Sequence, residues 1–218
     1  IEFFAYRVFA NRRNINELRF IKELMSKPEL LMELIMMVYK SDDGNEEEIS
    51  ESEQNNRKVM AKCAFPILYD LSCCPGVDNQ ENVNPDVLRS YIYRLYELSV
   101  ECHRTQVIDM VVGTLLGNLP RNASYPQAIL GEIVEELKSD SVDEHIRIRI
   151  FNSRGVTVRG FAEGGDQERS LAALFRSYRD KVKFTYPRLA KIFTKLMNGY
   201  ERDANREDYV AQLEDLEY

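Results

Sequence analysis

The segment from Asn152 to Arg169 combines residue types that could bind a ligand. It reads NSRGVTVRGFAEGGDQER and contains four glycines and three arginines. Glycine permits a backbone with positive φ, and arginine side chains bind anions such as phosphates. Free N–H groups at a helix start also favour negative charge, so an anion could bind where this segment enters the next helix. The predicted binding residues are Asn152, Arg154, Arg159, Asp166 and Arg169.

The glycine spacing of this segment does not match two familiar nucleotide-binding loops. Gly155 and Gly160 have the separation found in a Walker loop, but Phe161 follows where a lysine is required. The dinucleotide fingerprint G-x-G-x-x-G is also absent from the sequence. Asp166 is expected to act as the N-cap of the following helix. The alternative is that the arginines pair with neighbouring acids and the glycines only turn the chain.

Cysteine and histidine provide no recognisable catalytic or metal-binding pattern. The cysteines are Cys63, Cys73, Cys74 and Cys102, and their spacing fits neither a disulfide scaffold nor a zinc motif. His103 follows Cys102, but adjacent residues on a helix point apart, which disfavours Cys–His catalysis. We therefore expect free, mostly buried thiols, no metal, no cofactor and a non-catalytic chain in the reducing cytoplasm.

Charge is distributed unevenly along the chain, whose net charge is −7. Residues 42–53 contain seven acids and no base, and residues 201–218 contain seven acids and two bases. The region between, residues 145–195, contains twelve bases and four acids. It could attract the phosphates of a nucleic acid or pair with the chain's own acidic segments. The arginines that would contact phosphates are Arg147, Arg149, Arg154 and Arg159.

The composition is that of a soluble globular protein, with 44% hydrophobic and 30% charged residues. No run approaches the roughly 18 apolar residues that a membrane-spanning helix needs, so we expect no membrane partner. The sequence begins at Ile1 in the middle of an apolar pattern and carries no charged leader. We therefore expect a longer polypeptide to precede it.

Hydrophobic periodicity predicts helices along almost the whole chain. The clearest pattern comes last: residues 171–182 and 189–200 repeat apolar side chains at helical spacing on either side of a short break. Two such segments so close together predict an antiparallel helical hairpin at the C-terminal end.

Local signals refine the first half of the chain. The stretch SKPE, from Ser26 to Glu29, has the pattern of a capping box and should open a helix. The acidic stretch 41–53 is expected to be a loop. Pro66 lies within the next helical run, residues 53–71, and should kink or split it.

One stretch departs from the helical pattern. Ile146, Ile148 and Ile150 alternate with polar residues before NSRG, and Val156 and Val158 alternate after it. Alternation on both sides of a turn is typical of a β-hairpin. A lone two-stranded ribbon is only marginally stable, however. We expect the first arm to be helical and the second extended, with a short β-hairpin as the alternative.

These patterns together predict an all-α fold. It would be an irregular helical bundle or an α-solenoid-like stack of helix pairs, because no period of about 20 to 50 residues repeats. Residues 1–140 would form a helical stack with the acidic loop at 41–53. Residues 141–218 would form the Gly/Arg-rich loop and the C-terminal helical hairpin, within one continuous domain.

Four stretches carry a resemblance that spans nearly the whole chain: SKPELLMELIMMVYKSDD, FNSRGV, RGFAEGGDQERSLAALFRSY and YPRLAKIFTKLMNGYERDANRED. Together they resemble the C-terminal region of large, mostly uncharacterised multidomain bacterial proteins. The resemblance extends to helical-repeat sensor regions, including those of STAND-type defence NTPases. It implies a helical scaffold and designates no catalytic residue.

Three hypotheses for the function follow. The first is a non-catalytic helical interaction or sensor module, the C-terminal part of a larger bacterial protein, which recognises a protein partner or neighbouring domains of the same polypeptide. The second is a nucleic-acid-binding module that uses residues 145–195. The third is an enzyme with an unrecognised site. We favour the first, with residues 152–169 as the contact surface, because loops on rigid scaffolds often carry function.

Overall fold

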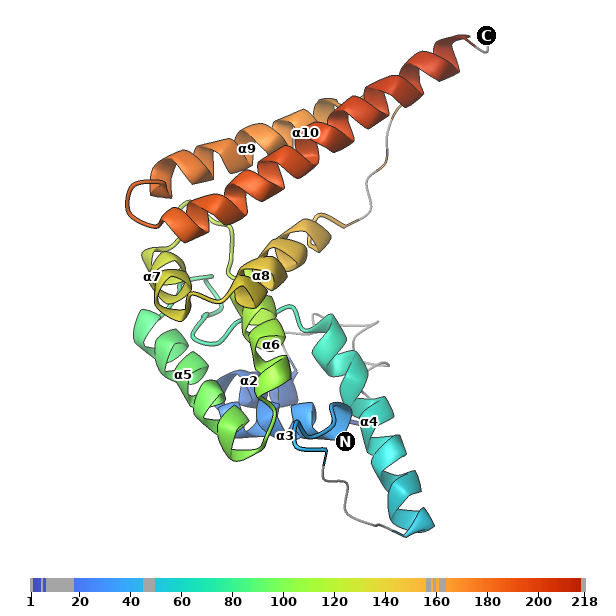
Figure 1. Ribbon diagram of the computed structural model, residues 1–218, viewed down its shortest axis with the longest axis vertical. Coiled ribbons are helices and arrows are strands. Elements are labelled where there is room, and N and C mark those ends of the chain that lie inside the picture. The colour runs from blue at the N-terminus through green and yellow to red at the C-terminus, as the bar shows by residue number, and fades with distance from the viewer. Residues whose placement is uncertain are drawn as a thin grey trace. The chain divides into compact units, whose positions relative to one another are not determined.

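The structure is a computed structural model, and it describes residues 2–4, 6, 18–44, 50–155, 158, 160 and 164–216. Within these ranges the regular elements are helices, and the only β-type pairing is an isolated bridge between Val77 and Val83. The predicted all-α fold is therefore confirmed (Figure 1). The chain divides into two compact units, unit 1 (residues 1–120) and unit 2 (residues 121–218).

Unit 1 is built around helix α3, which packs against three other helices. Its described helices are α2 (Arg19–Ser26), α3 (Pro28–Val38), α4 (Glu51–Asp70), α5 (Pro85–Glu101) and α6 (Thr105–Gly117). Helix α3 contacts α2, α4 and α5, and α5 in turn contacts α6. The hydroxyl of Tyr91 on α5 donates a 2.7 Å hydrogen bond to the carbonyl of Leu24 on α2. This buried bond links two helices that lie far apart in the sequence.

The capping box predicted at Ser26 is wrong. Ser26 is the last residue of α2, and α3 begins at Pro28 without a side-chain cap. A capping box lies instead at the start of α4, where the Ser50 hydroxyl accepts from the Glu53 N–H at 3.3 Å. The Glu53 carboxylate accepts from the Ser50 N–H at 2.9 Å. The loop predicted over residues 41–53 therefore extends too far, because residues 51–53 form the first turn of α4.

Helix α4 continues through Pro66, so the predicted split does not occur. The proline ring is buried with Ala64 and Ile67 on the inner face of the helix. Proline removes one main-chain hydrogen bond from a helix interior. Here the burial of this apolar face against α3 compensates for that loss.

Asp42, in the acidic stretch, caps the start of α6. Its carboxylate accepts hydrogen bonds from the Thr105 hydroxyl at 2.8 Å and the Gln106 N–H at 3.3 Å, and also from the Thr105 N–H. Desolvation opposes ionisation of Asp42, but these hydrogen bonds outweigh it and lower the pKa of the carboxyl group. The described part of the acidic stretch is therefore tied to the helical framework of unit 1.

Unit 2 is organised around the long helix α10. Its described helices are α7 (Ala128–Leu137), α8 (Asp140–Asn152), α9 (Asp166–Val182) and α10 (Pro187–Leu216). Helix α10 contacts α7, α8 and α9. Figure 1 shows α9 and α10 lying side by side, which confirms the predicted helical hairpin. Helix α7, which the sequence grouped with the first helical stack, belongs to unit 2.

Helix α8 contains the isoleucines whose alternation suggested a strand. The Ser139 hydroxyl accepts from the Val142 N–H at 3.2 Å and caps the helix. Val142, Ile146 and Ile150 then form a buried stripe at helical spacing, while Ile148 is exposed. The expected helix is thus confirmed for the first arm. The second arm lies mostly outside the described residues. In the described part of the chain, no helix is long and apolar enough to cross a bilayer.

Candidate functional site

Arg154 turns into unit 2 instead of towards solvent. It follows the end of α8, and its guanidinium Nη2 lies against the Glu168 carboxylate in the first turn of α9. Its Cζ atom lies 5.8 Å from the ring centroid of Tyr200 on α10, a cation–π distance. The Glu168 side chain is 0% exposed and that of Arg154 is 18% exposed. Arg154 therefore joins α8, α9 and α10 through a buried ion pair.

Arg169 is engaged by two carboxylates of the chain. Its Nη1 and Nη2 donate to Asp208 of α10 at 2.7 and 2.9 Å, and Nη2 also donates to Asp166 at 3.0 Å. The hydrogen bond from Arg169, followed by one from the Gly165 N–H at 2.8 Å, lowers the pKa of Asp208 to about 2. This bidentate contact links the start of α9 to α10.

The prediction that Asp166 caps α9 is wrong. The N-cap is Gly165, and Asp166 is the first helical residue, with its carboxylate turned to Arg169. Asp208 of α10 caps the start of α9 instead, because its carboxylate accepts a hydrogen bond from the Gly165 N–H. Gly165 also lies so close to Ala204 that a Cβ atom there would clash with the Ala204 main chain. The helix start approaches α10 too closely for any larger residue.

Among the described residues, the contacts of the predicted binding residues give no anion site around these two arginines. Asn152 ends α8 with an exposed side chain, and its carbonyl accepts from the Gly155 N–H at 3.3 Å. Arg159 lies outside the described residues. Arg154 and Arg169 each have a carboxylate partner, so the alternative that the arginines pair with the chain's own acids describes the geometry of these two.

The wider basic region shows the same pattern of pairing. Arg147 contacts Glu144, and Arg176 contacts Glu201 at the start of the acidic C-terminal stretch, each at 2.6 Å. Further described ion pairs join Arg179 and Lys183 to Asp180, Arg188 to Asp140 and Asp143, and Lys195 to Glu144. Much of the positive charge of residues 145–195 is thus met by acids of the same chain.

The cysteines and histidines give no catalytic geometry in the described residues. All four cysteines are free, as expected; Cys74 is buried, while Cys63, Cys73 and Cys102 are only partly buried. Burial raises the pKa of the Cys74 thiol and so disfavours a reactive thiolate there. Among the described residues, no group of three His, Cys, Asp or Glu side chains is placed to hold a metal ion.

An exposed apolar surface with a pocket beside it lies on α4 in unit 1. Phe65 and Tyr69, one helical turn apart, are 50% and 74% exposed. Their rings stack with centroids 5.8 Å apart and an angle of 20° between planes. Lys58 and Lys62 are exposed on the same side of the helix, at i, i+4, i+7 and i+11 spacing with the two rings. We call these four residues the α4 face.

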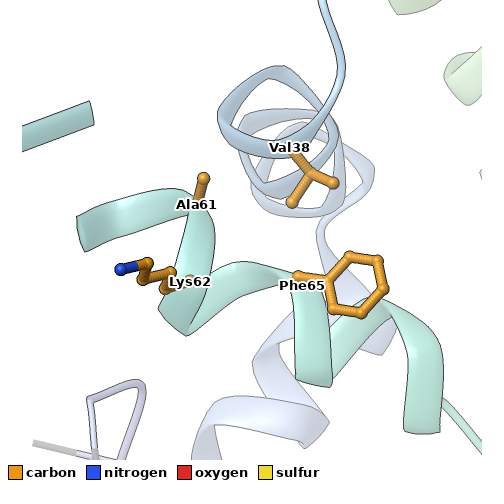
Figure 2. A pocket seen from close by; sticks show the side chains of 4 residues that line it. All are labelled: Val38, Ala61, Lys62 and Phe65. Atoms are coloured by element: carbon orange, nitrogen blue, oxygen red, sulfur yellow. The ribbon is translucent and has the colours of Figure 1, made fainter. Parts of the chain in front are cut away.

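A pocket of about 510 Å³ opens between α3 and the α4 face. Its described lining is Val38, Ala61, Lys62 and Phe65. Figure 2 shows Val38 reaching from α3 towards Ala61 and Phe65, while the ammonium group of Lys62 turns away from the ring. The pocket is thus apolar inside and carries a cation at its edge. Such a surface can take up an apolar side chain that has an acidic neighbour.

The α4 face was missed at the sequence level, although one signal for it exists. Helix α4 carries two apolar stripes, a buried one with Ala64, Ile67 and Leu71 just after its end, and an exposed one with Phe65 and Tyr69. Periodicity finds both stripes but does not say which of them is covered. The position of α3 decides this, and it is a tertiary contact.

Similarity to known proteins adds nothing to this geometry. Compared with models of protein families, with curated proteins and with solved structures, the chain gives no significant match.

Proposed function

We propose that the chain is a non-catalytic helical interaction module that recognises a protein partner through the α4 face. The observation that carries this proposal is the exposed, stacked pair of Phe65 and Tyr69 beside an apolar pocket. Burying a large apolar side chain contributes about 1.5–3 kcal/mol, so a partner that covers these rings gains binding energy. Aromatic side chains in such pockets are typical binding hot spots.

The partner that fits this surface is an acidic amphipathic helix. An apolar side chain of the partner would enter the pocket between Val38 and Phe65, and the next turn would cover Tyr69. Lys58 and Lys62 extend the α4 face in one direction and would meet carboxylates on the partner. This is the helix-in-groove mode, in which side chains one turn apart act as anchors.

The wider setting of the module is part of the same proposal. The resemblance to C-terminal regions of large bacterial proteins supports a sensor role in the cytoplasm, in a defence protein of the STAND type or a relative. A neighbouring domain of the same polypeptide would serve as partner equally well if it presents an acidic amphipathic helix. The all-helical fold, in which α3 and α4 pack against each other, supports a scaffold role.

Selection from a library of displayed helical peptides on the intact protein tests the proposal. Selected peptides are expected to combine apolar residues at i, i+4 spacing with Asp or Glu. They should bind the Phe65→Ser variant at least about tenfold more weakly than the wild type, as expected for a hot spot.

Phe184→Ser is the matched control, because it removes an exposed phenylalanine from the turn between α9 and α10. It should bind the selected peptides like the wild type. If the library yields no binder, or if the selected peptides bind Phe65→Ser as tightly as the wild type, the α4 face is not the recognition surface.

A further inference from the structure

The first half of α4, residues 51–59, lies outside the packed part of unit 1. Every residue in it is exposed, and Figure 1 shows it extending away from α3. The second half of the helix differs, because Ala64 and Ile67 are fully buried. The pocket shared with Val38 of α3 begins at Ala61. Burial therefore stabilises the second half of α4 and not the first half, which we call the α4 arm.

The sequence of the α4 arm, ESEQNNRKV, favours a helix only weakly. Serine, asparagine and valine rank low among helix-forming residues. Helices shorter than about 12–15 residues are marginal in water when no other element covers them, and the arm is shorter than that. Its helical form therefore depends on local interactions at its start.

The capping box at the start of α4 supplies these interactions. The Ser50 hydroxyl accepts from the Glu53 N–H at 3.3 Å, and the Glu53 carboxylate accepts from the N–H and the hydroxyl of Ser50 at 2.9 and 2.7 Å. Glu51 and Glu53 also lie in the first turn, where the helix dipole favours acids. Each contribution is modest, so we expect the helical and unfolded forms of the arm to differ little in free energy.

We propose that the α4 arm is a conditional helix, held near the balance of its folded and unfolded forms by the capping box and completed by an acidic partner. A partner shifts such a balance only through contacts that exist in one of the two forms. Lys58 provides this contact, because only the helical arm places it in line with Lys62 and Phe65 on the α4 face. The capping box thus regulates the affinity of the α4 face, although Ser50 lies outside that face. The inference rests on the proposed function, because it concerns regulation of the same surface.

Amide hydrogen exchange, measured residue by residue on the intact protein without a partner, tests the conditional helix. The N–H groups of the first turn have no acceptor within a helix and exchange in either form. The amides of residues 55–59 are therefore compared with those of Ala64 and Ile67. They should be at least about a hundredfold less protected, because their opening is local while that of the buried residues requires wider unfolding. Equal protection in the two halves of α4 would overturn the proposal.

Substitutions of the arm test the regulation, with an acidic helical peptide from the library as the probe. Ser50→Ala should weaken binding about two- to fivefold, because it removes the cap and the apparent affinity follows the fraction of protein in the competent form. Asn56 is exposed on the side of the helix opposite the α4 face. Asn56→Ala should therefore restore about half of the loss in the Ser50→Ala background through its higher helix propensity alone. Ser52→Ala is the matched control, because it keeps the capping box, and it should not weaken binding.

A Lys58→Gln background shows whether the regulation acts through Lys58. In this background Ser50→Ala should leave the peptide affinity unchanged, since the helical arm then carries no cation on the α4 face. A loss of affinity that persists in Lys58→Gln, or a Ser50→Ala protein that binds as tightly as the wild type, would overturn the proposal.

The outcomes for this inference and for the proposed function are distinguishable. If the peptides bind all variants of the arm equally but lose affinity for Phe65→Ser, the inference fails and the α4 face remains a recognition surface. If no peptide binds the wild type, the proposed function fails. Weak protection of residues 55–59 would then still support a conditional helix in the α4 arm.

Discussion

Removal of the Arg154 guanidinium tests how unit 2 holds its helices together. Replacing Arg154 by methionine keeps an apolar stem against Tyr200 but removes the Arg154 charge from beside the buried Glu168 carboxylate. Breaking a buried ion pair in this way costs about 3–5 kcal/mol. Because the Arg154 side chain is 18% exposed, we expect the low end, about 3 kcal/mol. In a unit of roughly 100 residues this lowers the Tm by about 12 °C or more.

Differential scanning calorimetry at neutral pH measures this effect, with the transition of unit 2 compared between variants. The double variant Arg154→Met/Glu168→Gln also removes the buried negative charge and should regain about half of the loss or more, since the cost lies in burying the Glu168 carboxylate beside no Arg154 charge. A Tm decrease below about 4 °C for the single variant, which corresponds to less than about 1 kcal/mol, would refute the reasoning. A double variant less stable than the single one would refute it as well.

Three further predictions follow from contacts of unit 2. The pKa of Asp208 is lowered from 3.8 to about 2, so its contribution to stability is present above pH 3.8 and is lost as the pH falls towards 2. The Asp208→Asn variant should therefore melt at a lower temperature than the wild type at pH 7, and its Tm should fall less steeply between pH 3.8 and 2. A Tm profile over pH that matches the wild type would contradict this. In Gly165→Ala the new methyl group clashes with the main chain of Ala204, which should lower the free energy of unfolding by about 1–3 kcal/mol. The loss should exceed that of Gly155→Ala, where a methyl group has space and only the strain of φ +73° opposes it. Equal free energies of unfolding of the two variants in urea would show that α9 can move away from α10. Fluorescence anisotropy with labelled DNA and RNA should show no binding at about 150 mM salt, because much of the basic region is ion-paired. Binding that falls steeply with salt would restore the nucleic-acid hypothesis.

The helices of unit 2 could be predicted from the sequence because their apolar stripes are long and regular. Phe175, Tyr178, Phe193 and Tyr200 recur at helical spacing and are all buried. The alternation of isoleucines at residues 146–150 was weak evidence for a strand, because these residues lie in α8. A helical stripe that begins at Val142 uses two of the same isoleucines, and the Ser139 cap fixes where the helix starts.

The chemistry of the Gly/Arg-rich segment could not be predicted, because its partners are remote in the sequence. The acid that receives Arg169 and the Gly165 N–H is Asp208, about forty residues further on. A local pattern indicates that arginines and glycines are present, but whether they face solvent depends on how α10 returns past them. The same reason explains the capping box, since SKPE and SESE both satisfy the pattern and only Ser50 is followed by a capped helix start.

The anchoring of α8 and α9 on α10 also affects how the segment between them can vary. Its two ends are fixed independently, by Arg154 on Glu168 and by Gly165 on Asp208. Since closing a loop whose ends are already held costs only about 0.6 kcal/mol more for each doubling of its length, insertions between these anchors would change the free energy of folding little. The connection is thus a place where length and sequence can diverge, or a foreign peptide can be grafted, while the helical framework stays intact.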